Sequence, residues 1–165
     1  MTSKFTIAAQ RNLAVTVQEA WALTADTSRY ADWVTSVRAV HTHHGAARVG
    51  EDYTETVGTI GPLTTHARWT VRVCDPLRLR VDSGEGFAPL SEVVNTFRFT
   101  PLPGGTGVSM TYEYSFVLRP RFAGALVRRL LEPGMRRDFD RAMQNLESVI
   151  LSERAAHDLS GEERE

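Results

Sequence analysis

The sequence has a single cysteine, Cys74, among its 165 residues. One cysteine cannot form an internal disulfide, and it provides no thiolate cluster for a metal ion. We therefore expect Cys74 to be a small hydrophobic side chain buried in a strand, since free cysteines are usually buried and inert. A chain of this length can bury a sizeable core without disulfides or metal, and a single domain is the expected arrangement.

Long hydrophobic runs are also missing. No apolar segment approaches the roughly 20 residues that cross a bilayer, so we expect no integral membrane span. The first residues, MTSKFTIAAQRNLAV, contain neither a basic leader followed by an apolar block nor a small-residue cleavage site. These features predict a soluble protein in the cytoplasm.

Neither sign of charge dominates the sequence, whose formal net charge is −1. A general nucleic-acid binder needs an excess of basic residues to replace the counterions around phosphates, so we expect no nucleic-acid partner. Residues 119–141 depart from this balance because they contain seven arginines and three acidic residues. Such a run is typical of a solvated helix face, and a weak contact with an anionic surface or an acidic partner is the alternative.

Signatures of common catalytic sites are missing as well. The sequence contains no Gly-rich phosphate loop, no Ser-centred nucleophile elbow and no paired-histidine zinc motif. His41 and His43 are spaced to share one face of a strand, but no third metal ligand can be located. We therefore expect no metal and no cofactor. An enzyme built on this sequence would work by positioning and proton transfer alone.

Two short helices are expected after a first strand. Alternation of apolar and polar residues predicts a strand over residues 5–13. Thr16, with Glu19 three residues later, is then typical of the capped start of a helix. A second short helix is predicted over residues 27–34, where large apolar residues recur at spacings of three and four.

The rest of the chain is predicted to form a series of strands and then a long helix. The strands, separated by turn-forming glycines and prolines, are expected near residues 37–43, 49–58, 63–74, 77–84, 91–100 and 107–118. From Arg121 apolar residues recur at helical spacing, with an interruption at Pro133 and a long helix over about 134–155. The charged segment 157–165 is predicted to be frayed or disordered, which leaves residues 1–156 as one ligand-binding domain.

Two segments resemble a known family. The segment VTVQEAWALTADTSRYADWV, residues 15–34, is similar to the strand end and helix pair of the START-like, helix-grip superfamily, and within it of the polyketide cyclase/dehydrase-type proteins grouped as SRPBCC. The segment VRVCDPLRLRV, residues 71–81, resembles the strand, Asp-Pro turn and strand of the same family. The family often has a proline ahead of the first helix, where this chain has Val15 and Thr16, and the threonine can cap the helix itself.

The resemblance covers residues 5–155 and implies an α+β helix-grip fold. In that fold a seven-stranded, curved antiparallel sheet wraps around a long C-terminal helix, two short helices follow the first strand, and a cavity lies between sheet and helix. The implied function is binding of a hydrophobic or aromatic small molecule, such as a lipid, a quinone or a polyketide-like compound. The alternative is a cofactor-independent polyketide cyclase, aromatase or dehydratase.

In the aromatase/cyclase members of the superfamily, a pocket-facing serine or threonine and an arginine on the strand ahead of the Asp-Pro turn are implicated. Here Arg68 and Arg72 fall on the outward phase of the predicted strand. A one-residue bulge would turn one of them inward. Without such a bulge the cyclase alternative is weaker.

Strand alternation identifies the side chains that would face the cavity. The inward phase is otherwise apolar, but it includes Glu55 and Asn95, which are costly to bury without a partner. Glu55 lies either near a solvated cavity mouth or in the pocket, where its pKa would be raised and it could act in acid–base catalysis. Glu55 or a tyrosine is therefore the candidate proton donor.

The predicted ligand-binding set combines this inward phase with rings from the short helices and a Met/Phe stripe on the last helix. Its members are Tyr30, Trp33, Tyr53, Glu55, Trp69, Asn95, Phe97, Tyr112, Tyr114, Met135, Phe139 and Met143. For Tyr30 and Trp33 the alternative is that they only fasten the helix pair to the sheet.

Overall fold

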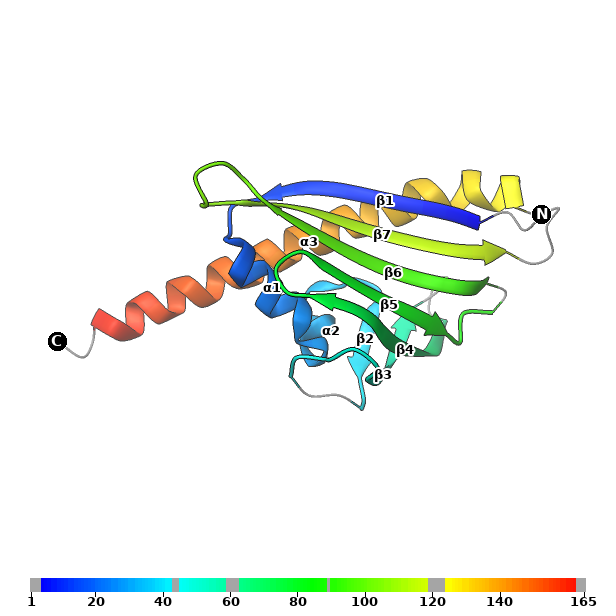
Figure 1. The fold of residues 1–165 in the computed structure, drawn as a ribbon, viewed down its shortest axis with the longest axis horizontal. Helices are drawn as coiled ribbons and strands as arrows, with labels where there is room; N and C mark the ends of the chain where they lie inside the picture. Colours follow the sequence, from blue (N-terminus) through cyan, green and yellow to red (C-terminus); the bar gives the residue numbers. More distant parts are fainter. Residues whose placement is uncertain (1–3, 43–44, 59–62, 89, 119–123, 163–165) are drawn as a thin grey trace.

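Seven antiparallel strands form one sheet in the order β1-β7-β6-β5-β4-β3-β2, and the helices pack against one of its faces (Figure 1). The computed structural model describes residues 4–42, 45–58, 63–88, 90–118 and 124–162. The strands are β1 (Lys4–Leu13), β2 (Val37–Val40), β3 (Asp52–Gly58), β4 (Thr64–Asp75), β5 (Leu79–Glu85), β6 (Leu90–Pro101) and β7 (Val108–Leu118). The predicted α+β helix-grip architecture is confirmed.

The helices are α1 (Val17–Ala25), the 3-10 helix η1 (Thr27–Arg29), α2 (Tyr30–Trp33) and α3 (Gly124–Glu162). The predicted capping box is present, because the Glu19 amide donates to the Thr16 hydroxyl at 3.2 Å and the Thr16 amide donates to the Glu19 carboxylate at 2.8 Å. The second short helix begins as a 3-10 turn, which the Asp26 carboxylate caps by accepting from the Ser28 amide.

Helix α3 differs from the prediction at both ends. It continues through Pro133, where the sequence predicted an interruption. Pro133 and Gly134 are exposed, so water can hydrate the carbonyl that the missing proline amide leaves unpaired. Residues 157–162 continue the helix, where the sequence predicted a frayed or disordered segment. Two ion pairs from the preceding turn fix the direction of this end. Arg154 pairs with Glu19 of α1 at 2.7 Å, and Glu153 pairs with Arg29 of η1 at 2.6 Å.

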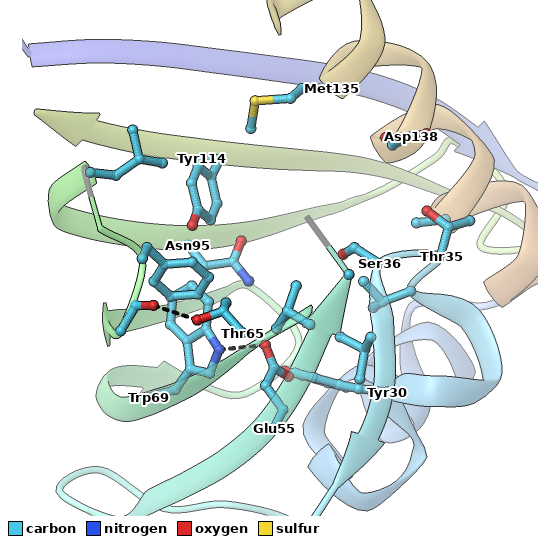
Figure 2. A pocket seen from close by; sticks show the side chains of 18 of the residues that line it. Tyr30, Thr35, Ser36, Glu55, Thr65, Trp69, Asn95, Tyr114, Met135 and Asp138 are labelled. Atoms are coloured by element: carbon cyan, nitrogen blue, oxygen red, sulfur yellow. Dashed lines mark hydrogen bonds between the residues drawn. The ribbon is translucent and has the colours of Figure 1, made fainter. Parts of the chain in front are cut away.

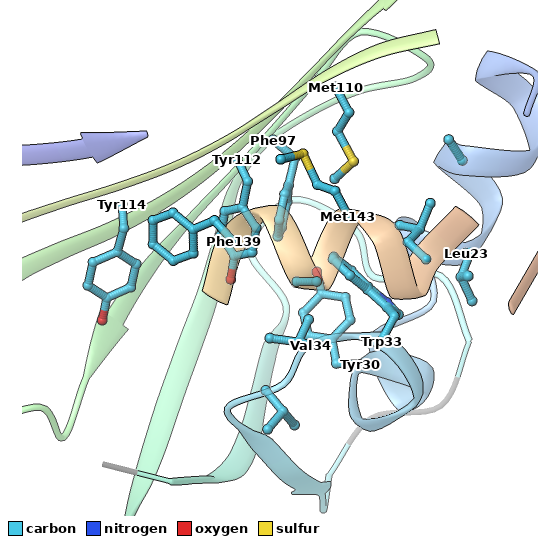
Figure 3. Close-up of a cluster of buried hydrophobic side chains, with 14 of the residues drawn as sticks. Leu23, Tyr30, Trp33, Val34, Phe97, Met110, Tyr112, Tyr114, Phe139 and Met143 are labelled. Atoms are coloured by element: carbon cyan, nitrogen blue, oxygen red, sulfur yellow. The ribbon is translucent and has the colours of Figure 1, made fainter. Parts of the chain in front are cut away.

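The inner face of the sheet follows the predicted two-residue period in β3, β6 and β7. Its aromatic side chains pack with α2 and α3 in the buried cluster of Figure 3. The Phe139 ring of α3 stacks on Tyr112 with centroids 4.3 Å apart and an interplanar angle of 19°. This contact joins the long helix to the middle of the sheet.

Strand β4 departs from the prediction at both ends. Two-residue alternation over the predicted strand 63–74 places Leu63 and Val73 on the inner face, but they are 65% and 37% exposed. Leu63 precedes the strand, and a register shift between Val71 and Val73 changes the phase at the other end. Cys74 is half-buried, with its thiol 3.9 Å from the Ala47 carbonyl.

A buried charge pair on β5 fastens α1 to the sheet. Arg80 and Asp82 are both fully buried and are joined by a bond of 3.1 Å from Nε to Oδ1. The other Asp82 oxygen accepts from the Tyr53 hydroxyl at 2.9 Å. Arg80 also donates to the Ala25 carbonyl at 3.0 Å, in the last turn of α1. A cation at this end of the helix is favourable because the helix dipole is negative there.

Substitution of Arg80 by methionine is expected to lower the free energy of unfolding by about 3–5 kcal/mol, because it leaves the Asp82 carboxylate buried without its cation. The measurement is urea unfolding of the folded protein at neutral pH. The double variant Arg80→Met/Asp82→Leu should recover much of the loss, because it removes both charges.

Arg78→Met serves as the control for this prediction. Arg78 lies 3.5 Å from Asp75 in an ion pair whose side chains are 78% and 49% exposed. Exposed pairs of this kind contribute about 0–1 kcal/mol. Equal losses in the two variants would show that Arg80 does not fasten the helix as described.

Candidate functional site

A cavity of about 760 Å³ lies between the inner face of the sheet, α3 and the segment that connects α2 to β2 (Figure 2). Its exposed lining residues belong to the ends of the β3–β4 and β5–β6 connections and to α3, so the mouth lies there. Asp138 of α3 is exposed at this mouth, whereas Glu55 and Tyr30 are buried at the opposite, deep end. A volume of this size is typical of small-molecule sites.

Nine of the twelve residues in the predicted ligand-binding set line this cavity. They are Tyr30, Tyr53, Glu55, Trp69, Asn95, Tyr112, Tyr114, Met135 and Phe139. The structure thus brings together side chains from β3, β4, β6, β7, α2 and α3. Whether they contact a ligand remains a prediction.

The other three members, Trp33, Phe97 and Met143, lie in the packed core behind the cavity and are almost fully buried. Trp33 contacts Phe97 with ring centroids 5.7 Å apart. The Trp33 backbone carbonyl accepts a hydrogen bond of 3.3 Å from the side-chain Nδ2 of Asn145 in α3. The structure therefore favours the alternative interpretation of Trp33, in which it fastens α2 between sheet and long helix.

The Glu55 carboxyl is the central polar group of the deep end. It is 3% exposed, and its Oε1 accepts a hydrogen bond of 2.6 Å from the Trp69 indole nitrogen. Its Oε2 is buried without a hydrogen-bond partner among the described residues. Burial raises the pKa of this carboxyl to about 7, and the nearby Asp82 charge acts in the same direction.

Two further buried polar atoms at the cavity wall lack a partner within the described part of the chain: the Asn95 Oδ1 and the Tyr30 hydroxyl. Asn95 is 5% exposed. Burial also raises the pKa of the Tyr30 and Tyr112 hydroxyls, so both remain neutral at physiological pH. Buried polar groups without a partner are costly in a protein interior, and a ligand or water can satisfy them.

A glycine on β5 gives Trp69 the space to reach Glu55. A Cβ atom at Gly84 would lie 2.6 Å from the Trp69 ring and 2.9 Å from Phe87. The Trp69 and Phe87 rings pack with centroids 5.1 Å apart. The indole is therefore fixed between Gly84 and Phe87, and its nitrogen points at the carboxylate.

The arginines that a cyclase site would use on β4 do not enter the cavity. The register shift in β4 lies between Val71 and Val73, and both Arg68 and Arg72 remain exposed. Arg68 pairs with Asp52, and Arg72 donates to the Ser83 hydroxyl at 2.7 Å. Arg80 on β5 is buried on the inner side of the sheet, but it does not line the cavity.

Sequence analysis missed the Arg80–Asp82 pair because the alternate residues Leu79 and Val81 are apolar and suggest the opposite phase. Both apolar residues are only half-buried. The Asp-Pro turn quoted above does set the start of β5, but the face of each residue depends on its partner in β6. In that register Arg80 pairs with Phe97 and Asp82 with Asn95, both of which face inward.

Across the described ranges, no group of three His, Cys, Asp or Glu side chains is arranged to hold a metal ion. His41 lies on the outer face, where its Nε2 is 2.8 Å from the Thr56 hydroxyl, and His43 lies outside the described residues. No helix in those ranges has the length and apolar character of a membrane span. Of the Arg-rich segment, residues 119–123 are not described, and Arg137 and Arg141 are exposed.

The chain was compared with known proteins by its sequence and by its fold. Residues 4–150 match a family described as "Polyketide cyclase / dehydrase and lipid transport". No curated protein matches the chain. The solved structures with the same fold include the following three. The protein TTHA0849 from Thermus thermophilus has 18% identity and a TM-score of 0.70, and the alignment covers 90% of this chain and 98% of that one.

The second is the Zhui aromatase/cyclase from Streptomyces sp. R1128, with 17% identity, a TM-score of 0.70 and coverage of 90% of this chain and 94% of that one. The third is norcoclaurine synthase from Thalictrum flavum in complex with dopamine and hydroxybenzaldehyde, with 14% identity, a TM-score of 0.67 and coverage of 92% and 88%. At these identities the likeness is one of fold.

The Glu55 pKa predicts a pH-dependent stability. A carboxyl that titrates at about 7 in the folded state and at 4.5 in the unfolded state binds more protons when folded, so stability falls as pH rises through this interval. Between pH 4.5 and pH 7 the unfolding free energy of the wild-type protein should therefore fall by about 3 kcal/mol relative to that of Glu55→Gln. This value follows from the shift in the Glu55 pKa at about 1.4 kcal/mol per pKa unit.

The measurement is urea unfolding of both proteins at intervals of half a pH unit from pH 4.5 to pH 8. Glutamine keeps an oxygen that can accept from Trp69 but cannot ionise, so the difference between the two curves isolates the titration of Glu55 from that of Asp82 and other groups. Parallel curves over the whole range would contradict a raised Glu55 pKa.

Proposed function

Because the chain belongs to the polyketide cyclase / dehydrase and lipid transport family, we propose that it binds a hydrophobic small molecule in the cavity between sheet and α3. The observation that carries this proposal is the cavity of about 760 Å³ in the middle of an otherwise closely packed core. A filled core would be the more stable arrangement, since interiors pack densely and cavities lower stability. A space of this size is therefore explained by a ligand.

The wall supports a largely apolar ligand. Aromatic and aliphatic side chains form most of it, and few polar groups reach the interior. Burial of apolar ligand surface against such a wall contributes about 25 cal/mol per Å² of area. Met135 and Leu131 of α3 are half-buried near the mouth, and a flexible thioether adapts to ligands of different shape. Lipids, quinones and polyketide-like compounds all fit this description.

Filling the cavity is expected to abolish binding. Ala142 of α3 lines the cavity and is 1% exposed, so a phenylalanine at this position occupies ligand space. Ala142→Phe should weaken binding of the neutral dye Nile red by more than about tenfold in a fluorescence titration, with far-UV circular dichroism as the check on folding.

Ala155→Phe is the matched control, because Ala155 lies on the same helix and is exposed. It adds the same side chain without reducing the cavity and should bind Nile red as the wild type does. Failure of the wild-type protein to bind the dye, or equal weakening in both variants, would overturn the proposed function.

A second candidate function, acid–base catalysis on the bound ligand, is supported by Glu55. A carboxyl with a pKa of about 7 is well suited to exchange protons at physiological pH. In a cyclisation, the Glu55 carboxylate would take a proton from a carbon between two carbonyl groups of the substrate. The resulting enolate carbon would attack another carbonyl of the same molecule and form a C–C bond, and the new alkoxide would take the proton back from Glu55. The step is an isomerisation and needs no other reactant.

Under this candidate function, Glu55→Gln should lower turnover of a linear poly-β-ketone thioester by about 10²–10⁴-fold while Nile red affinity is retained. The assay follows the cyclised product by absorbance. Glu113→Gln, on the opposite face of β7, is the control for loss of a carboxylate. Unchanged turnover in Glu55→Gln would exclude Glu55 as the base, and a wild-type protein that binds without turnover would leave the carrier function alone.

A further inference from the structure

The deep end of the cavity has a defined hydrogen-bonding pattern that an entirely apolar ligand does not use. Glu55 Oε2, Asn95 Oδ1 and the Tyr30 hydroxyl are each buried there without a partner among residues that the structure describes. Figure 2 shows the Glu55 carboxyl and the Asn95 amide pointing into the same space beside Trp69. The remaining wall of the cavity is mostly apolar and includes the Tyr53, Trp69 and Tyr112 rings.

The charges at the wall are of one sign. Glu55 and Asp138 are the ionisable acids among the described lining residues, and that same set contains no lysine, arginine or histidine. Arg80 is not part of the lining, and its charge is paired with Asp82. A carboxylate or phosphate on the ligand would therefore meet no cation in the cavity and would lie close to Glu55. Burial of an unpaired anion in an apolar site is strongly unfavourable.

A hydroxyl group fits this end in either protonation state of Glu55. It can accept a hydrogen bond from the neutral carboxylic acid or donate one to the carboxylate, and it can donate to Asn95 Oδ1 or pair with the Tyr30 hydroxyl. An ammonium group could also donate to these oxygens, but its desolvation costs far more than that of a hydroxyl. A hydrocarbon would leave these buried polar atoms without a hydrogen-bond partner, which is unfavourable.

We propose that the ligand carries an uncharged hydroxyl group, and that this group binds at the deep end of the cavity between Glu55 and Asn95. The proposal rests on the proposed ligand-binding function and specifies the chemistry of the ligand. Fatty acids and other anionic amphiphiles are excluded by it, whereas phenols, enols and alicyclic alcohols with an apolar skeleton are included. The apolar remainder of the ligand then extends toward Met135 and the mouth.

The test compares four probes on one skeleton: 2-naphthol, 2-methylnaphthalene, 2-naphthoate and 2-(aminomethyl)naphthalene. Their Kd values for the wild-type protein are measured at pH 7 by displacement of Nile red and corrected for water–octanol transfer. We expect 2-naphthol to bind about tenfold more tightly than 2-methylnaphthalene, and 2-naphthoate to bind more weakly than both. Tighter binding of the naphthoate or of the amine than of 2-naphthol would overturn the proposal.

Variants assign the preference to the two residues. In the wild type, the Kd of 2-methylnaphthalene divided by that of 2-naphthol measures the preference for the hydroxyl. Asn95→Leu and Glu55→Leu should each reduce this ratio to about threefold or less. Because the same two probes are compared in every variant, differences in the hydration of the free probes do not affect the comparison. Thr96→Val is the matched control. Thr96 follows Asn95 in β6 and is only 5% exposed, but it does not line the cavity. Its ratio should equal that of the wild type.

The outcomes distinguish failure of the proposed ligand-binding function from failure of the hydroxyl site. If Nile red itself does not bind, the proposed function fails. If the dye binds but none of the four probes displaces it, the deep hydroxyl site is wrong. If 2-methylnaphthalene binds as tightly as 2-naphthol, or if Asn95→Leu keeps the full preference, the cavity binds hydrophobic molecules but the deep hydroxyl site is wrong. Should Glu55→Leu not fold, Asn95→Leu with the Thr96→Val control decides the question.

Discussion

The buried pair of Arg80 and Asp82 is the interaction on which the site depends. It lies at the junction of β5, β3 and the end of α1, where Arg80 meets the Ala25 carbonyl and Asp82 accepts from Tyr53. The Tyr30 and Tyr53 rings lie on the guanidinium at 5.9 Å from their centroids. Loss of this pair would remove the Arg80 hydrogen bond to the last turn of α1, which directly precedes the segment that carries Tyr30. The deep end of the cavity is therefore built on a charge pair that the cavity does not expose.

The same low-polarity surroundings that make this pair strong also set the chemistry of Glu55. A single carboxyl is held by one indole nitrogen, faces an apolar space and lies near the charge of Asp82. Burial and the Asp82 charge favour its neutral form up to about neutrality, whereas the hydrogen bond from Trp69 acts in the opposite direction. In the two functions proposed above, ligand binding and proton transfer would consequently use the same carboxyl atoms.

Much of the fold could be predicted from local patterns. The inward faces of β3, β6 and β7 follow from alternation, because apolar and aromatic residues occupy one phase in each strand. The capping box at Thr16 is likewise a local property. The continuation of α3 through Pro133 was not predictable in this way, since it depends on the exposure of that turn.

The candidate site was predicted in part, and the errors have a common cause. Glu55 could not be assigned to mouth or pocket from its strand alone, because its burial depends on Trp69, Gly84 and Phe87 from two other elements. Trp33 and Phe97 have the chemistry of a pocket wall, but their neighbours in space make them core. Arg80 and Asp82 face inward only because of their register with β6. Each of these outcomes is set by contacts between residues distant in sequence.

The separation between the Arg80–Asp82 anchor and the cavity lining has an evolutionary consequence. Residues such as Thr65, Leu90 and Met135 line the cavity but are not part of that anchor. Substitutions among them can alter the shape of the space while the scaffold that holds α1 to the sheet stays unchanged. A lineage can thus change the shape of its cavity through folded intermediates, and members with little sequence in common can retain one backbone.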